Sequence, residues 1–260
     1  MGLGREEHGG DGDPLVLVHG VATSRLIWRH VTGPLAAGGR RVVTVDVPGF
    51  GESDPVGPGF ELEDVADALV DGLAIERFDL VGHSLGGAVA VAAAARHADR
   101  VNRLILVSPA GLAPRAQGLA AALGAAAELA VHARRALGHP WVEHAAARRA
   151  MFGTTVADAG RLDPDDARML LEASDGARRI GDGVRQALEA DLRDDLAAAP
   201  MPVGLIWGCA DRVVPFGGLD ALRELRPDMA VETLDGTGHI PQVEDPAAFV
   251  AALQRLLAAL

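Results

Sequence analysis

The chain has 260 residues and a formal net charge of −12, and 49% of its residues are hydrophobic. This length allows one α/β domain with an insertion, and the acidic charge argues against nucleic acid or an anionic membrane as the main partner. All 24 basic residues are arginine, which excludes chemistry that depends on a lysine, such as a Schiff base or a phosphate-binding P-loop.

Alternating strands and helices are predicted along most of the chain. Short apolar runs predict strands, and longer segments with apolar residues at helical spacing predict helices. The expected strands are residues 15–19, 41–46, 78–82, 101–107, 203–207 and 230–234, and the expected helices are 62–72, 85–97, 219–226 and 246–257. This alternation is typical of a mostly parallel sheet with helices on both faces.

One long segment interrupts the alternation. Residues 112–199 are rich in alanine, arginine and leucine, and their glycines and prolines predict about four helices. Pro200 and Pro202 then mark the return to strand and helix alternation. We therefore expect a core of residues 1–111 and 200–260, with residues 112–199 as a helical insertion.

The most informative motif occupies residues 82–86, with the sequence Gly-His-Ser-Leu-Gly. An apolar strand precedes it and an alanine-rich helix follows. A serine on such a sharp turn exposes its hydroxyl beside the free N–H groups of the helix N-terminus, and the glycines relieve crowding. Ser84 is therefore the candidate nucleophile, although the pentapeptide alone also fits an ordinary serine in a glycine-rich loop.

A nucleophilic serine needs a base, and the base needs a group that orients it. Asp211 and His239 each lie in a loop just past the end of a predicted strand, where the sites of parallel sheets gather. Asp211 could instead cap a following helix, but the loop after strand 101–107 offers no carboxylate in its place. His19 and His83 are expected to support nearby loops by hydrogen bonding.

These features resemble the α/β-hydrolase fold of the carboxylesterase type, whose chain order is Ser, Asp, His. The matching motifs are residues 18–20, 46–53, 82–87, 208–215, 236–239 and 244–246. The resemblance implies that residues 112–199 form a helical cap over the active site. It also implies that the antiparallel hairpin at the start of this fold is shortened or missing, because only 14 residues precede Leu15. We expect a six-stranded sheet on this basis.

The remaining site residues follow from the same resemblance. The oxyanion hole is expected at the backbone N–H groups of Val21 and Leu85. The arginine pairs 134–135, 148–149 and 178–179 are expected on solvated helix faces, with the alternative that one arginine holds a substrate carboxylate. The candidates for the substrate pocket are Trp28, Trp141, Phe152, Met169, Val214 and Ile240. Those within residues 112–199 could instead form the cap's own core.

The expected function is that of a serine hydrolase that cleaves carboxylic esters with short-to-medium acyl chains through an acyl-enzyme. Ser84 argues against epoxide and haloalkane hydrolases of this fold, which carry an aspartate nucleophile. His83 and the loop at residues 21–24 depart from the carbon–carbon bond hydrolases of ring-cleavage products. Those enzymes and thioesterases are the alternatives, and a non-catalytic hydrolase-like binding protein is a remote one.

No cofactor and no metal site are expected. The cap histidines lack a ligand-like arrangement, and no G-x-G-x-x-G motif follows the first strand. Residues 1–13 lack the apolar core of a signal peptide, and no apolar run approaches the roughly 20 residues that span a bilayer. These features and the single Cys209 predict a cytoplasmic enzyme without integral membrane association. Its expected partner is a small-molecule ester, and the oligomeric state is left open.

Overall fold

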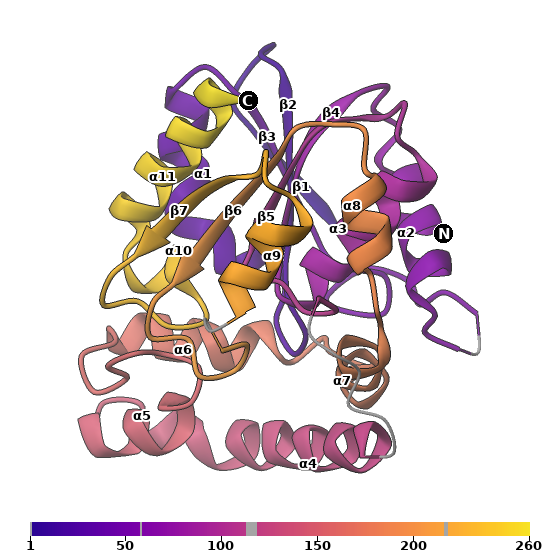
Figure 1. Cartoon of the computed structure of the whole chain (residues 1–260). Helices are drawn as coiled ribbons and strands as arrows, with labels where there is room; N and C mark the ends of the chain where they lie inside the picture. Colours follow the sequence, from indigo (N-terminus) through magenta and orange to yellow (C-terminus); the bar gives the residue numbers. More distant parts are fainter. Residues whose placement is uncertain (1, 58, 113–118, 216–217) are drawn as a thin grey trace.

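A twisted sheet forms the centre of the protein in a computed structural model that describes residues 2–57, 59–112, 119–215 and 218–260 (Figure 1). This part of the chain contains a seven-stranded sheet in the order β1-β3-β2-β4-β5-β6-β7. β1 is antiparallel to β3, and all other neighbours are parallel. The strands are β1 (Arg5–His8), β2 (Pro14–Val18), β3 (Arg41–Val45), β4 (Phe78–His83), β5 (Val101–Val107), β6 (Val203–Gly208) and β7 (Ala230–Leu234).

Helices cover both faces of the sheet (Figure 1). α1 (Arg29–Ala37) and α11 (Pro246–Ala259) pack together on one face, whereas α2 (Leu62–Leu73), α3 (Leu85–Arg96) and α8 (Arg193–Ala198) pack on the other. The short elements of the core are η1 (Arg25–Trp28), α9 (Leu219–Leu225) and α10 (Pro241–Glu244). The predicted mostly parallel α/β-hydrolase sheet with helices on both faces is therefore confirmed.

Two hydrophobic clusters hold the layers together, one on each face of the sheet. All six residues of β4 are buried, as expected for a central parallel strand that is covered on both faces. α2 buries one stripe of its surface, with Leu62, Val65 and Leu69 at helical spacing. This packing fixes the position of the turn that carries Ser84.

The edge strand β1 corrects the expected six-stranded sheet. Its sequence, Arg-Glu-Glu-His, has no apolar alternation, and its first three residues are exposed. A polar edge strand of this kind is a common protection against edge-to-edge pairing, and it gives no hydrophobic signal in the sequence. The antiparallel edge described here is this single strand, in agreement with a shortened hairpin.

The segment expected as a cap lies across the carboxyl ends of the strands (Figure 1). It contains α4 (Ala120–Gly138), η2 (His139–Trp141), α5 (Ala145–Phe152), α6 (Pro164–Ala173) and α7 (Ile180–Glu189), and α4 packs along α7. With α8, this described part holds five α-helices rather than the expected four, and α8 packs against α3 of the core. Residues 113–118 of the expected insertion lie outside the described residues. The division at residues 112 and 199 stays a prediction.

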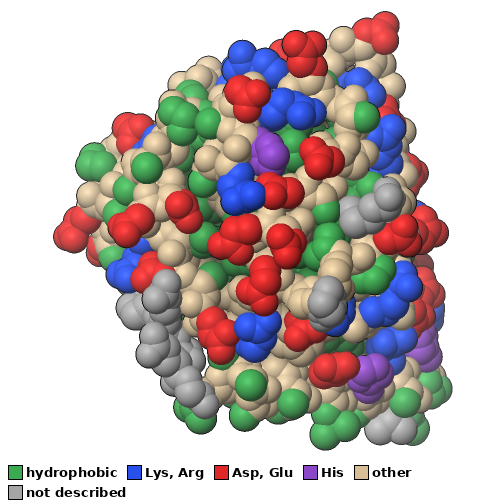
Figure 2. Space-filling view, turned by 90° about the vertical axis from the view of Figure 1, so that its right-hand side faces the viewer, with side chains coloured by type: hydrophobic (Ala, Val, Ile, Leu, Met, Phe, Trp, Pro, Cys, Tyr) green, Lys and Arg blue, Asp and Glu red, His purple; other side chains and the backbone are tan. Residues whose placement is uncertain are grey.

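The surface carries many charged side chains. Figure 2 shows acidic and arginine side chains interspersed over one face, so the acidic excess is spread over that face. None of the helices in the described ranges combines the length and hydropathy that a membrane-crossing segment requires.

Candidate active site

The turn between β4 and α3 places Ser84 in a strained conformation. Ser84 has φ of 54° and ψ of −118°, in the left-handed region that residues other than glycine rarely occupy. Such a conformation costs about 1–3 kcal/mol and persists only where surrounding contacts enforce it. Those contacts include the hydrogen bond from the Ser84 N–H to the carbonyl of Val107, at 3.0 Å, and the one from the Ala110 N–H to the carbonyl of Ser84, at 3.1 Å.

Two glycines of the motif permit close backbone approach around this turn. A Cβ atom on Gly82 would lie 2.3 Å from the carbonyl oxygen of Gly86. A Cβ atom on Gly86 would lie 2.4 Å from the carbonyl oxygen of His19. Both distances are shorter than any tolerable contact, so the predicted role of these glycines in relieving crowding has a direct steric basis.

Ser84, His239 and Asp211 come together in one hydrogen-bonded chain. His239 Nε2 lies 2.9 Å from Ser84 Oγ, and His239 Nδ1 lies 2.8 Å from Asp211 Oδ2. If Nδ1–H donates to the carboxylate, Nε2 is left free to accept the serine proton. The three side chains are buried, and they have the geometry of a Ser-His-Asp triad.

The environment of Asp211 favours its carboxylate form. Burial alone would raise its pKa, but the hydrogen bond and charge of His239 and the N–H groups of Val214 and Val213 outweigh burial and lower the pKa. These two amides donate to Oδ1 at 3.0 Å and 2.8 Å. The turn after β6 therefore holds the carboxylate in one orientation, toward the histidine.

Two buried histidines support the loops around the site, as the sequence predicts. His83 Nε2 donates to the carbonyl of His239 at 2.7 Å, and the two rings lie 4.9 Å apart. Burial, with the nearby charge of His239, lowers the pKa of His83 to about 3, so its ring is neutral at ordinary pH. His19 Nδ1 donates to the carbonyl of Gly20, and its Nε2 accepts from the N–H of Val47.

The candidate oxyanion-hole amides belong to Val21 and Leu85. Leu85 is the first residue of α3, and Val21 follows the His19-Gly20 turn at the end of β2. Within the described ranges, neither N–H has a hydrogen-bond acceptor in the protein. Two such free donors next to a nucleophile are what an oxyanion requires.

A cavity of about 340 Å³ opens beside the serine and the histidine. It lies between the loop after β2 and the cap helices, and most of its wall is apolar. Phe152 and Ile240 line it as predicted, together with Val21. The other apolar side chains that line it are Ala22, Ala127, Val131, Leu170, Ile180, Val184 and Val213.

Four predicted pocket residues lie elsewhere. Trp28 and Met169 are buried in the hydrophobic cluster that includes α11 and α6, where the Trp28 ring packs against His83 and Phe249. Trp141 is 57% exposed and lines a separate groove on the outside of the cap. The Val214 side chain packs against the hydrophobic core, and its neighbour Val213 lines the cavity instead.

Polar side chains also line the cavity, and its threonines were not predicted, whereas Arg134 belongs to the arginine pairs considered for a substrate carboxylate. Thr154 and Thr155 line it from the loop after α5, and Arg134 lines it from α4. On α4, the spacing of Ala127, Val131 and Arg134 places all three on one helix face, and this pattern in the sequence could have indicated that they line the cavity together. The threonines lie in an irregular loop, where no periodicity indicates which side chains face inward.

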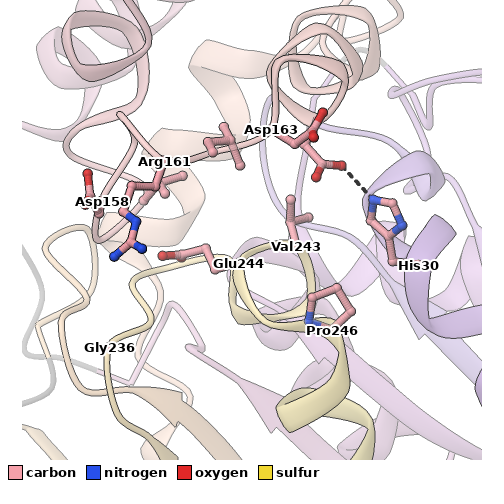
Figure 3. A pocket seen from close by; sticks show the side chains of 11 residues that line it. His30, Asp158, Arg161, Asp163, Gly236, Val243, Glu244 and Pro246 are labelled. Atoms are coloured by element: carbon pink, nitrogen blue, oxygen red, sulfur yellow. Dashed lines mark hydrogen bonds and ion pairs between the residues drawn. The ribbon is translucent and has the colours of Figure 1, made fainter. Parts of the chain in front are cut away.

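A second cavity, of about 450 Å³, lies behind the histidine loop between core and cap (Figure 3). Glu244 reaches into this region from α10 and accepts hydrogen bonds from the N–H groups of Gly238 at 2.9 Å, Ile240 at 3.2 Å and Ala157 at 2.8 Å. Burial raises the pKa of Glu244, while these amides act in the opposite direction. The motif at 244–246 therefore fixes both neighbours of His239.

No group of three or more histidine, cysteine, aspartate or glutamate side chains in the described ranges is arranged to hold a metal ion. His30 Nε2 lies 2.6 Å from Asp166 Oδ1 beside the second cavity, and this hydrogen bond links α1 to α6 (Figure 3).

The fold and the arrangement of the three side chains define the class as a hydrolase. The chain belongs to the alpha/beta hydrolase family, whose model matches residues 15–252. It is 30% identical over 270 residues to 2-hydroxymuconate semialdehyde hydrolase from Pseudomonas sp. (strain CF600), covering 96% of this chain and 88% of that protein. It is 29% identical over 248 residues to pimeloyl-[acyl-carrier protein] methyl ester esterase from Photobacterium profundum, covering 94% of each.

Solved structures agree on the fold. A thermophilic esterase from Thermogutta terrifontis matches with a TM-score of 0.79 at 24% identity, covering 99% of this chain and 93% of that one. Bromoperoxidase from Bacillus anthracis matches with the same TM-score and identity, covering 98% and 95%. At this identity the likeness shows the fold alone.

Proposed function

We propose that the protein is a serine hydrolase that cleaves carboxylic esters of short-to-medium acyl chains. The observation that carries the proposal is the hydrogen-bonded chain from Ser84 Oγ through His239 to Asp211, at 2.9 Å and 2.8 Å, at the wall of a largely apolar cavity. A volume of about 340 Å³ is near the lower end for small-molecule sites, which favours compact substrates.

The geometry supports a two-step mechanism. Ser84 Oγ attacks the ester carbonyl while His239 Nε2 takes the hydroxyl proton, and the N–H groups of Leu85 and Val21 stabilise the oxyanion. His239 then gives the proton to the departing alkoxide, which leaves an acyl-enzyme. A water molecule, deprotonated by His239, releases the acid and restores Ser84.

The decisive test is a hydrolysis profile across p-nitrophenyl esters of increasing chain length, for the wild type and for Ser84→Ala. We expect the highest kcat/KM with short or medium chains and loss of turnover in the variant. Turnover that persists in Ser84→Ala, or that rises steeply only above the micelle-forming concentration of a long-chain ester, would contradict the proposal.

A second candidate is hydrolysis of a carbon–carbon bond in a ring-cleavage-type diketone. It is supported by the 30% identity to 2-hydroxymuconate semialdehyde hydrolase, because the same serine and histidine are available for either bond. A vinylogous diketone and a thioester in the same assay separate these alternatives: the favoured substrate is the one with the highest kcat/KM.

A further inference from the structure

Arg134 lines the same cavity as Ser84 and His239. It lies on α4 of the cap, and its guanidinium carbon is 5.1 Å from the centre of the Phe152 ring. It also lines the outer groove that contains Trp141, so it stands between the inner cavity and that groove. Among the described residues that line the inner cavity, it is the one with a permanent charge.

This guanidinium has no anionic partner in the described residues. Arg134 has neither a hydrogen bond nor an ion pair there, and its Nε is buried without an acceptor. The lining residues within the described part of the chain include no aspartate or glutamate. Burial lowers the pKa of Arg134, because it removes water from around the cation.

Two other arginines of the cap, Arg135 and Arg148, have acceptors in the protein. Arg135 Nε donates to Asp175 Oδ1 at 2.8 Å, and the two Nη atoms of Arg148 donate to the carbonyls of Val142 and Gly160. The Phe152 ring stabilises the Arg134 cation by a cation–π contact, but it accepts no hydrogen bond from the guanidinium N–H groups. A partly buried guanidinium with unused donors at an apolar wall matches a carboxylate, which it can bind through two parallel hydrogen bonds.

We propose that Arg134 binds a carboxylate of the substrate, so that the site takes small esters with a carboxylate remote from the scissile bond. This inference rests on the proposed esterase function and names its substrate class. The Arg134 guanidinium would hold the charged end of the substrate while the reacting carbonyl lies at Ser84.

The test compares charged esters with neutral esters of the same shape. One pair is monomethyl adipate and methyl 6-methylheptanoate, with the carboxylate on the acyl side. The other is 4-acetoxybutanoate and 4-methylpentyl acetate, with the carboxylate on the alcohol side. Arg134→Met removes the charge and keeps an apolar stem, Arg134→Lys restores a charge, and Arg135→Met is the matched control on the same helix.

We expect the wild type to prefer the charged member of at least one pair by about tenfold in kcat/KM, mainly through KM. Arg134→Met should abolish that preference, so that the charged and neutral members of each pair have similar kcat/KM, and Arg134→Lys should restore part of it. Arg135→Met should leave the preference unchanged. Equal rates within both pairs, or a preference that survives Arg134→Met, would overturn the inference.

Failure of the proposed function gives a different result. If the wild type hydrolyses none of the four esters, the binding of monomethyl adipate is measured by calorimetry instead. Binding to the wild type that is lost in Arg134→Met and kept in Arg135→Met supports the carboxylate site without esterase activity. Equal binding to all three proteins, or no binding to the wild type, overturns the inference.

Discussion

The side chain of His83 donates a 2.7 Å hydrogen bond to the backbone carbonyl of His239. His83 immediately precedes Ser84, so the residue next to the candidate nucleophile directly holds the loop of the candidate base. The distance between Ser84 Oγ and His239 Nε2 therefore depends on a contact between their own loops, 155 residues apart in the sequence.

The first prediction concerns Ser84. Ser84→Ala should lower the rate of ester hydrolysis by at least about 10³-fold and abolish covalent labelling by a phosphonate inhibitor. Mass spectrometry of the labelled peptide checks this. Label found instead on another serine, such as Ser108 directly after β5, would move the nucleophile to that residue.

The second prediction concerns the strain at the same position. Because Ser84 has φ of 54°, Ser84→Gly should be more stable than Ser84→Ala by about 1 kcal/mol. Urea unfolding of the two inactive variants measures the difference. Equal stabilities would show that the turn relaxes when the serine is removed.

The third prediction concerns Asp211. Asp211→Asn should lower kcat by roughly 10³–10⁴-fold even at high pH, because the amide removes the charge and favours the wrong tautomer of His239. A kcat profile against pH checks this, and the wild type should gain activity as the pH rises from acid toward neutral. Near-normal activity in the variant would mean that another carboxylate orients His239.

The fourth prediction concerns pH and stability. His83 has a folded pKa of about 3, against an ordinary value of about 6.5, because it is buried beside His239. Between these values the unfolded chain binds a proton at His83 that the folded protein does not bind. The lowered pKa of His83 therefore reduces the free energy of unfolding as the pH falls from about 6.5 toward 3.

His83→Gln keeps a donor for the His239 carbonyl and removes this ionisation. The free energy of unfolding should then fall less steeply with acidification, by up to about 1.4 kcal/mol per pH unit. Urea unfolding at several pH values measures the slope. His132→Gln is the control, because His132 is exposed on α4, and a slope unchanged in both variants would contradict the prediction.

The fifth prediction concerns Glu244, which accepts hydrogen bonds from the N–H groups of Gly238 and Ile240, on the two sides of His239. Glu244→Gln replaces one acceptor oxygen with a donor, so the loop should loosen and kcat should fall about tenfold with little change in KM. Asp245→Ala removes only the cap of α11, which accepts from the Ala248 N–H. It should cost stability but leave kcat unchanged. Equal losses of kcat in the two variants would indicate general destabilisation.

The sequence predicts the features that depend on local patterns. The buried parallel strands are continuous apolar runs, and the loops of Ser84, Asp211 and His239 each follow one of them, so three distant residues could be placed at one edge of the sheet. β1 was missed because its charged residues have no apolar pattern.

The cavity wall was harder to predict because it depends on how the cap packs. Trp141 and Phe152 have the same apolar character in the sequence, yet one is exposed on the outside and the other is buried at the cavity. Val213 and Val214 are adjacent in one turn and both donate their N–H groups to Asp211, yet only Val213 lines the cavity, while Val214 packs against the core. The unpaired state of Arg134 is likewise visible only in three dimensions.

The loop after α5 supplies a backbone acceptor to the candidate base: the His239 N–H donates to the carbonyl of Thr155 at 2.9 Å. Ala157, two residues further on, donates to Glu244. A chimera that receives the cap of another family member would thus exchange part of the support of its histidine together with the specificity pocket. Grafts that retain residues 153–157 of this chain should keep their turnover, whereas grafts that replace this pentapeptide should need compensating changes near Glu244.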